Sequence, residues 1–326
     1  MLAQGKMLRS VLVMNMDTQL ENISQAKYGK EIAALDAEQV YIVVLCMLKG
    51  LLDTFIRTKG EKKFYYISTA LEKGSFLENN LHNLGIYDIL EGVLVSKGQE
   101  MAALKQVEVD YIGDAKSFEQ TSKNFFMESK QYGLPSEAMG IRCIKTHSEL
   151  ECDNYSYQTE KSWLEKLDIS REIVFDDVKA KILFYQMDVV GKDKEIYQFH
   201  LHDLEIENEI QEEDKQIYYD YFLVNCCVRR ILQEMRNNQY DLRKMERYAR
   251  IGMEGKYVNF VIPELIRIMV NEKAIPVEEA AEVVRKVCGY EDMTAMIEAV
   301  KQCPQEYVEK LVPRLVEKIK GVECKK

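Results

Sequence analysis

The apolar residues of this chain follow a helical spacing in two long stretches. Over 37–56 they recur at i, i+3 and i+4 after Asp36, a residue type that often caps the first turn of a helix. Over 250–313 the same spacing predicts a series of helices, two of which begin beside Pro263 and Pro276. Proline suits these places because it lacks the N–H that a first helical turn leaves unbonded. Both stretches therefore predict buried helical layers.

Strand patterns occupy the middle of the chain. Short runs of β-branched and aromatic residues, some with apolar residues at every second position, predict strands near Tyr65, Ile141, Ile182 and Phe199. A highly charged link follows the last of these strands, and the spacing then predicts a helix over 219–242. Strands in the first part of the chain are thus followed by a helical end.

These elements predict an α/β fold, with a mixed central sheet flanked by helices and a C-terminal helical layer. Residues 1–36 are expected to be an N-terminal lead-in, either helical or poorly ordered. Residues 37–326 are expected to form a single domain. Within it we expect an α/β part over 37–216 and a mainly helical part over 217–326.

Composition narrows the class of partner. The formal net charge is −10 and the isoelectric point is about 5.2. This argues against a surface for nucleic acid or anionic membranes, because such surfaces need clustered Lys and Arg. The most apolar run, 40–56, is shorter than a membrane span and contains Lys49 and Asp53. Eight cysteines without a signal-peptide pattern fit reduced thiols. We therefore expect a soluble cytoplasmic protein that binds neither nucleic acid nor membrane.

Two kinds of reactive site compete with a packing role for the histidines and cysteines. His200 and His202 share one face of a predicted strand, so with Cys226 or Cys227 they could form a zinc site. Adjacent helical cysteines point to different sides, so only one could contribute, and the spacing is a weak zinc signal. A nucleophilic cysteine would need a base in a geometry that spacing does not define. Buried core thiols are the favoured interpretation, and no metal site is expected.

Three segments resemble one known family. The chain reads Ile-Pro-Glu-Leu-Ile-Arg-Ile-Met-Val over 262–270 and Leu-Val-Pro-Arg over 311–314. Within 65–85 it carries Tyr-Tyr-Ile-Ser and then Leu-Glu-Asn-Asn-Leu-His-Asn-Leu-Gly. In order and spacing these segments are similar to the glycogen/starch (α-glucan) phosphorylases, and the resemblance extends from about Tyr28 to Arg314. It implies the fold of the first domain of a two-domain, glycosyltransferase-type phosphorylase.

The resemblance fails at the positions that carry the family's chemistry. The family's Asn-Asp-Thr-His is Glu-Gly-Lys-Tyr at 254–257, a second family histidine is Met293, and a family carboxylate is Ala70. The family's glycine-rich loop corresponds to 112–119, where one glycine remains beside two acidic residues. We expect this loop not to bind phosphate or sulfate, because carboxylates disfavour a bound anion. No catalytic residue is therefore expected.

The resemblance also implies that one half of the enzyme is missing. The chain ends at Lys326, soon after the family's first domain would end. The second domain, with the lysine that binds pyridoxal phosphate, is expected to be absent, so no cofactor is expected. The favoured function is a truncated, non-catalytic phosphorylase-like protein that binds α-glucan or associates with a genuine phosphorylase or with itself. The alternative is half of an active α-glucan phosphorylase, completed in trans by a second chain. A decaying gene is the third interpretation.

Two residues are candidates for contact with a protein partner. Tyr257 and Met293 stand where the family places site residues that face the cleft between its two domains. Aromatic and methionine side chains are enriched in interface cores. We therefore expect a small apolar centre around Tyr257 and Met293, inside a charged rim, that contacts another protein.

Overall fold

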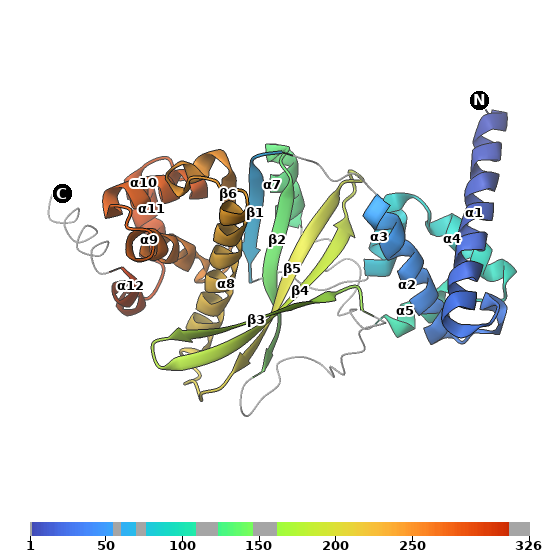
Figure 1. Cartoon of the computed structure of the whole chain (residues 1–326), viewed down its shortest axis with the longest axis horizontal. Helices are drawn as coiled ribbons and strands as arrows, with labels where there is room; N and C mark the ends of the chain where they lie inside the picture. The colour runs from blue at the N-terminus through green and yellow to red at the C-terminus, as the bar shows by residue number, and fades with distance from the viewer. Residues whose placement is uncertain (1, 55–59, 70–75, 109–122, 146–161, 313–326) are drawn as a thin grey trace.

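The structure is a computed structural model that describes residues 2–54, 60–69, 76–108, 123–145 and 162–312. Figure 1 shows N-terminal helices at one end of the long axis, a sheet in the middle and C-terminal helices at the other end. The predicted α/β fold with a mixed central sheet is confirmed. Ala70 and the loop 112–119, for which predictions were made, lie outside the described residues.

The N-terminal end is a group of packed helices. Asp36 caps the second helix as its sequence predicts, because its Oδ1 accepts a hydrogen bond from the N–H of Gln39 at 2.9 Å. The lead-in is also helical, and its Met16 and Leu20 are buried in the same core as the second helix. The helices are α1 (Leu2–Tyr28), α2 (Ala37–Thr54), α3 (Phe76–Leu84), α4 (Tyr87–Ser96) and α5 (Met101–Val107), with a short 3-10 turn η1 (Ile32–Ala34).

Six strands form one sheet in the order β3-β4-β5-β2-β1-β6. They are β1 (Lys63–Ser68), β2 (Ser136–Lys145), β3 (Glu165–Phe175), β4 (Val178–Val190), β5 (Ile196–Ile206) and β6 (Ala249–Glu254). The pairs β1–β2, β1–β6 and β2–β5 are parallel, whereas β3–β4 and β4–β5 are antiparallel. The helix α7 (Lys123–Tyr132) precedes β2.

The two faces of the sheet belong to two different cores. Because successive strand residues point to opposite faces, Tyr65 packs in the core that contains the C-terminal helices. Its neighbours Phe64 and Tyr66 pack in the core that contains the N-terminal helices and Phe125 of α7. The sheet therefore joins the two helical ends of the molecule.

The C-terminal helices cover one face of the sheet, with α8 closest to it (Figure 1). Pro263 lies in the first turn of α9, and Pro276 immediately precedes α10, as the sequence predicts. The helices are α8 (Lys215–Asn237), α9 (Val261–Asn271), α10 (Val277–Cys288), α11 (Met293–Val300) and α12 (Gln305–Leu311), with 3-10 turns η3 (Leu242–Arg247) and η4 (Val258–Phe260).

Two elements differ from the sequence prediction. Strand β6 lies inside the part predicted to be mainly helical, where it pairs with β1 at the edge of the sheet. Helix α8 begins at Lys215 rather than at Tyr219 and ends at Asn237 rather than at Leu242. The charged link before α8 is therefore shorter than predicted.

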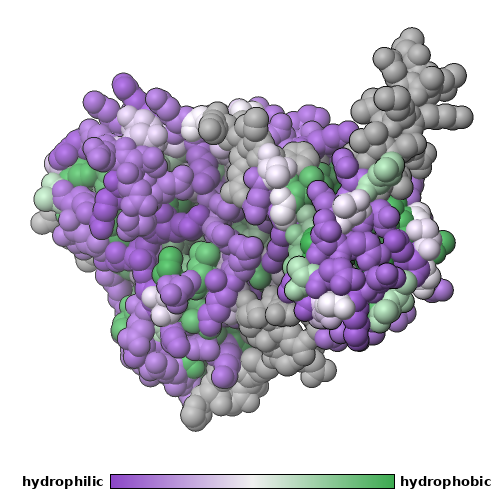
Figure 2. Space-filling model, turned by 45° about the vertical axis from the view of Figure 1, so that its right-hand side comes forward, coloured by the Kyte–Doolittle hydropathy of each residue, from purple (hydrophilic) through white to green (hydrophobic). Residues whose placement is uncertain are grey.

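The face of the molecule in Figure 2 is mainly hydrophilic, and its hydrophobic residues are scattered in small groups. Hydrophobic side chains that are exposed among the described residues include Met14, Val95, Met127, Ile169 and Val174. None of the described helices combines the length and hydropathy that crossing a membrane would need.

Candidate functional site

Glu254, the first of the four residues that align with the family's Asn-Asp-Thr-His, lies at the carboxyl end of β6, beside the carboxyl end of β1. These two strands are parallel neighbours, and Ser68 pairs in register with Glu254 at the last position of each. In open α/β sheets ligands bind beyond the carboxyl ends of parallel strands. This edge of the sheet is therefore the candidate functional site.

The carboxylate of Glu254 ties the two strand ends together. Its Oε2 accepts a hydrogen bond from the Tyr66 hydroxyl at 2.6 Å and a longer one from the Ser68 hydroxyl at 3.2 Å. The main chain adds a third link, because the N–H of Thr69 donates to the carbonyl of Glu254 at 3.1 Å. Glu254 is thus bound to its own fold at the position where the family carries asparagine.

Gly255 lets the chain leave β6 close to β1. Its φ is +140°, a value that side chains other than glycine's rarely adopt. A Cβ at this position would stand 2.3 Å from Oγ1 of Thr69. Glycine is therefore required here for the strand ends to approach each other, in place of the aspartate of the family pattern.

The loop after Gly255 is hydrogen-bonded to α8. Asp220 is fully buried, and its Oδ2 accepts a hydrogen bond from the N–H of Tyr257 at 3.0 Å. Its Oδ1 accepts a second one from the Gln216 amide at 2.6 Å. Burial raises the pKa of Asp220 to about 6, although these hydrogen bonds and Lys256 act in the opposite direction. The loop that carries Tyr257 thus depends on a buried carboxylate.

A second carboxylate lies beside β6. The Glu128 carboxylate from α7 sits over Gly252, because a Cβ there would come within 2.9 Å of its Oε2. Burial raises the pKa of Glu128, Arg250 lowers it, and Glu254 raises it further. Two carboxylates near a sheet edge could serve acid–base chemistry. The two hydroxyls that donate to Glu254 come from β1, so this carboxylate also contributes to holding the two strands together.

The two residues predicted to contact a partner lie on separate elements. Tyr257 immediately precedes η4 and is partly buried, with its ring centre 6.4 Å from that of Phe260 and the Lys256 ammonium 4.7 Å above it. Met293 is the first residue of α11 and is also partly buried against the C-terminal core. Each therefore has a packed side and an accessible part. Their contact with a partner stays a prediction.

The residues of the rejected zinc alternative are buried between the sheet and α8. His200 Nε2 lies 3.1 Å from Oε1 of Glu137 and 2.7 Å from Nη2 of Arg230. Burial raises the pKa of both thiols, Cys226 and Cys227, which disfavours the thiolate that zinc binding or nucleophilic attack requires. Within the described ranges, no group of three His, Cys, Asp or Glu side chains is arranged to hold a metal ion.

Sequence reasoning missed the charged cluster around these histidines. Glu137 of β2 is fully buried and forms ion pairs with Lys63 of β1 and Arg230 of α8. Lys63 also bonds Glu234 at 3.1 Å. A glutamate beside apolar strand residues gives a weak signal on its own, because its partners are far away in the sequence.

Sequence comparisons identify the relatives of this fold. The family model described as carbohydrate phosphorylase matches residues 206–325. The maltodextrin phosphorylase of Streptococcus pneumoniae is 25% identical over 91% of this chain and 44% of its own length. The glycogen phosphorylase of Bacillus subtilis is 22% identical over 79% of this chain and 39% of its own length. The chain therefore spans about two fifths of these relatives. Over most of its own length it is similar in sequence to these phosphorylases.

Proposed function

We propose that this chain is a non-catalytic relative of the phosphorylases that acts by associating with a genuine phosphorylase. One observation carries the proposal: the Glu254 carboxylate, at a family site position, is bonded to Tyr66 and Ser68 of its own fold. Gly255, Lys256 and Tyr257 stand where the family has aspartate, threonine and histidine. A carboxylate engaged in this way supports the fold, and we infer that it does not act on a substrate.

The surroundings of Tyr257 favour a protein partner over a glucan chain. Sugars stack on open aromatic faces, but the Lys256 ammonium lies over this ring. Their sequence neighbours Lys256, Glu291 and Asp292 are exposed, whereas Tyr257 and Met293 themselves are partly buried. A small apolar centre within a charged rim is the composition of protein interfaces.

Two partly buried lysines of the described part of the chain, Lys63 and Lys215, do not fit the Schiff base of pyridoxal phosphate. Such a lysine must lose its proton and stand free of carboxylates. Lys63 is enclosed but is held by Glu137 and Glu234, and Lys215 is paired with Glu212 at 2.7 Å. These ion pairs occupy the ammonium groups of both lysines.

Activity measurements on the purified chain test the non-catalytic assignment. With glucan and phosphate the chain should release no glucose 1-phosphate above a blank and should show no pyridoxal phosphate absorbance. Turnover that co-purifies with the chain would overturn the assignment. Turnover that appears only after a second chain is added would instead support the rival function, a phosphorylase half completed in trans.

Pull-down with a phosphorylase from the same cell tests the association. The double variant Tyr257→Asp/Met293→Asp should lose the complex and keep its circular dichroism spectrum. Val95→Asp is the matched control, because Val95 is 63% exposed on α4. Equal capture of both variants would contradict the assigned face. Retention on glucan, removed by the double variant alone, would assign the face to glucan instead.

A further inference from the structure

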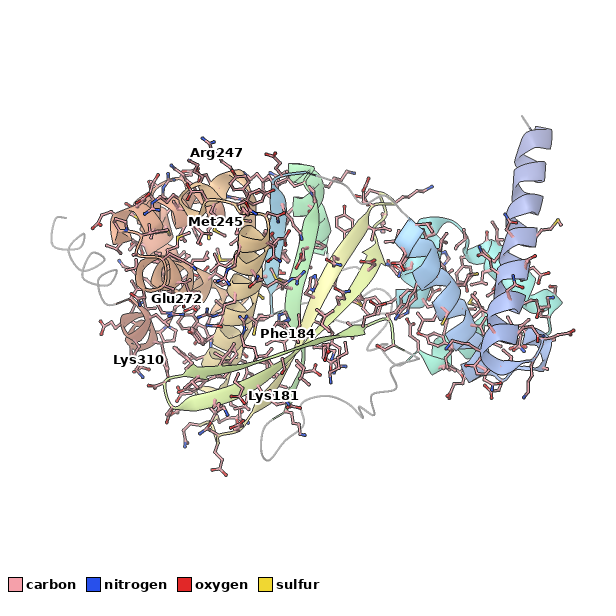
Figure 3. All side chains as sticks on the ribbon, in the orientation of Figure 1. Lys181, Phe184, Met245, Arg247, Glu272 and Lys310 are labelled. Atoms are coloured by element: carbon pink, nitrogen blue, oxygen red, sulfur yellow. The ribbon has the colours of Figure 1, made fainter. Side chains whose placement is uncertain are left out.

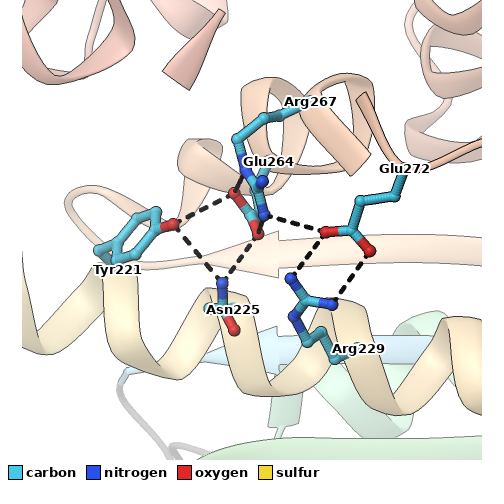
Figure 4. Close-up of polar contacts among 6 residues, drawn as sticks. All are labelled: Tyr221, Asn225, Arg229, Glu264, Arg267 and Glu272. Carbon is cyan, nitrogen blue, oxygen red and sulfur yellow. Dashed lines mark hydrogen bonds and ion pairs between the residues drawn. The ribbon is translucent and has the colours of Figure 1, made fainter. Parts of the chain in front are cut away.

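The buried carboxylate of Glu264, on α9, is compensated by a positive charge. It lies about two turns before Glu272, which Figure 3 labels just after the end of α9. Arg267 donates two hydrogen bonds of 2.8 Å to this carboxylate, and Tyr221 and Asn225 of α8 donate one each (Figure 4). A buried charge is tolerated here because a cation and hydrogen bonds replace the water that it has lost.

Asp220, the residue before Tyr221 on α8, is buried without such a cation. Its two carboxylate oxygens accept hydrogen bonds from neutral groups, the Tyr257 N–H at 3.0 Å and the Gln216 amide at 2.6 Å. Within the residues that the structure describes, no basic side chain forms an ion pair with Asp220, and Lys256 acts on it through its charge at longer range. Ionised Asp220 is therefore a buried charge that only neutral donors compensate.

The groups that face Asp220 belong to three parts of the chain. Gln216 lies on α8, Lys256 and Tyr257 lie in the loop before η4, and Cys303 lies between α11 and α12. Burial, and then the charge of Asp220, raise the pKa of the Cys303 thiol to about 12, so this thiol stays protonated near neutral pH. Its Sγ donates to the carbonyl oxygen of Tyr257 at 4.0 Å. Tyr257 is thus contacted at its N–H by a carboxylate and at its carbonyl by a thiol.

A proton on Asp220 would change its two hydrogen bonds unequally. Both oxygens face N–H donors, so a carboxyl O–H needs one of these donors to be replaced by an acceptor. The Gln216 amide can turn and present its oxygen, whereas the main-chain N–H of Tyr257 cannot. The proton therefore belongs on Oδ1, and the Tyr257 N–H is left with a neutral acceptor. Hydrogen bonds to charged acceptors are roughly twice as strong as neutral ones, so protonation weakens the bond to Tyr257.

We propose that Asp220 is a proton-dependent positioning residue of the face that carries Tyr257: its ionised carboxylate fixes the loop 255–257, and its protonation loosens this loop. The inference rests on the proposed function, because a looser loop presents Tyr257 less precisely to a phosphorylase partner. Burial raises the pKa of Asp220 to about 6, so the change falls close to neutral pH.

Loosening of the loop differs in sign from unfolding of the chain. The pKa of Asp220 in the fold lies above that of an unfolded aspartate, about 3.9. Between these values the folded chain binds a proton that the unfolded chain does not, so this group adds stability as the pH falls. A weaker Tyr257 hydrogen bond at low pH is therefore a local effect of Asp220, separable from acid denaturation.

Amide hydrogen exchange of the full chain tests the inference without any partner. Protection of the Tyr257 N–H, corrected for the intrinsic exchange rate at each pH, should fall about fivefold between pH 7.5 and 5 in the wild-type chain. This is the difference between a charge-assisted and a neutral hydrogen bond. Asp220→Asn, whose amide oxygen can still accept from Tyr257, should show the lower protection at both pH values.

Asp241→Asn is the matched control. Asp241 also accepts a hydrogen bond from a main-chain N–H at 3.0 Å, that of Arg243, but it is exposed. Its substitution should leave the pH dependence at Tyr257 unchanged. Urea denaturation at pH 7.5 should show Asp220→Asn to be no less stable than the wild type, because the substitution removes an uncompensated buried charge.

Capture of a phosphorylase by the same variants separates this inference from the proposed function. Capture by the wild type should fall between pH 7.5 and 5, and capture by Asp220→Asn should stay at the lower level. Protection at Tyr257 that is independent of pH in the wild type would overturn the role of Asp220, even if a phosphorylase is captured. Loss of the pH dependence in Asp241→Asn would also overturn it. Protection that follows Asp220 while no phosphorylase is captured at either pH would retain that role and refute the proposed function.

Discussion

The two faces of the central sheet are stabilised in different ways. One face carries aromatic rings, with Phe125 in edge contact with Phe199 at 5.4 Å and roughly parallel to Phe64 at 6.4 Å between ring centres. The other face, under α8, carries Glu137 and His200 with their ionic partners. Successive residues of the same strands thus meet opposite environments. The aromatic face depends on apolar area removed from water, whereas the charged face depends on each partner being present.

The charged face also differs in that its buried titratable groups have strongly shifted pKa values. Burial alone would raise the pKa of Glu137, but His200, Lys63 and Arg230 lower it to about 2. Burial lowers the pKa of His200 to about 3 and that of His202 to about 3. The charged face therefore holds an ionised glutamate and two neutral histidines near neutral pH. Stability and its pH dependence should therefore divide between the two faces.

The largest effect is expected on the aromatic face. Phe125→Ala should lower the free energy of unfolding by about 4 kcal/mol, because it removes a fully buried ring and leaves a cavity. Urea denaturation at two pH values measures the loss, which should be the same at both. Phe184→Ala, at a partly buried ring of β4 labelled in Figure 3, is the control and should cost less. If Phe125→Ala lost no more stability than Phe184→Ala, the aromatic face would not depend on its buried rings as expected.

A smaller loss is expected from Glu137→Gln on the charged face. The change should cost about 3 kcal/mol at neutral pH, because Lys63 and Arg230 lose the carboxylate that compensates them. Lys63 remains 22% exposed, so water offsets part of the effect. Glu298→Gln, at a carboxylate that is 60% exposed, should change stability by less than about 0.5 kcal/mol. Equal losses in the two variants would show that the buried pairs contribute nothing.

The smallest expected effect concerns the slope of the free energy of unfolding against pH, to which His202 contributes. Its pKa is about 3 in the folded chain and about 6.5 when unfolded. Between these values the unfolded chain binds a proton that the folded chain does not, so stability falls as the pH falls. His202→Phe should make this fall shallower by about 1.4 kcal/mol per pH unit. The measurement is urea denaturation from pH 6 to 4. An unchanged slope would show that His202 is already protonated in the fold.

The sequence predicts what local spacing determines and misses what distant pairing determines. The apolar residues of α9 recur at helical spacing, and those of β1 form a short aromatic run, so the sequence predicts both elements. In β6 the alternation of Ala249, Ile251 and Met253 is present, but it is six residues long and the stronger helical pattern of the next segment outweighed it. Short alternating runs next to helices are therefore easily missed.

At the candidate site, too, the sequence predicted some features and missed those that depend on long-range contacts. The resemblance located Glu254 and Tyr257 at the family's site positions. It did not predict that Glu254 would bond Tyr66, 188 residues away, or that Asp220 of α8 would hold the N–H of Tyr257. Those contacts depend on how β1, β6 and α8 come together in space, which the spacing of residues along the chain does not encode.

The pairing of β1 with β6 has a consequence for synthesis. The two strands are separated by more than 180 residues, yet they are hydrogen-bonded neighbours at one edge of the sheet. While the chain emerges from the ribosome, β1 can pair with β2 long before β6 exists, because domains fold as their segments become available. Until β6 arrives, β1 presents an open, apolar strand edge to other chains. Until β6 has been synthesised, this edge is therefore the part of the sheet most exposed to pairing with another chain.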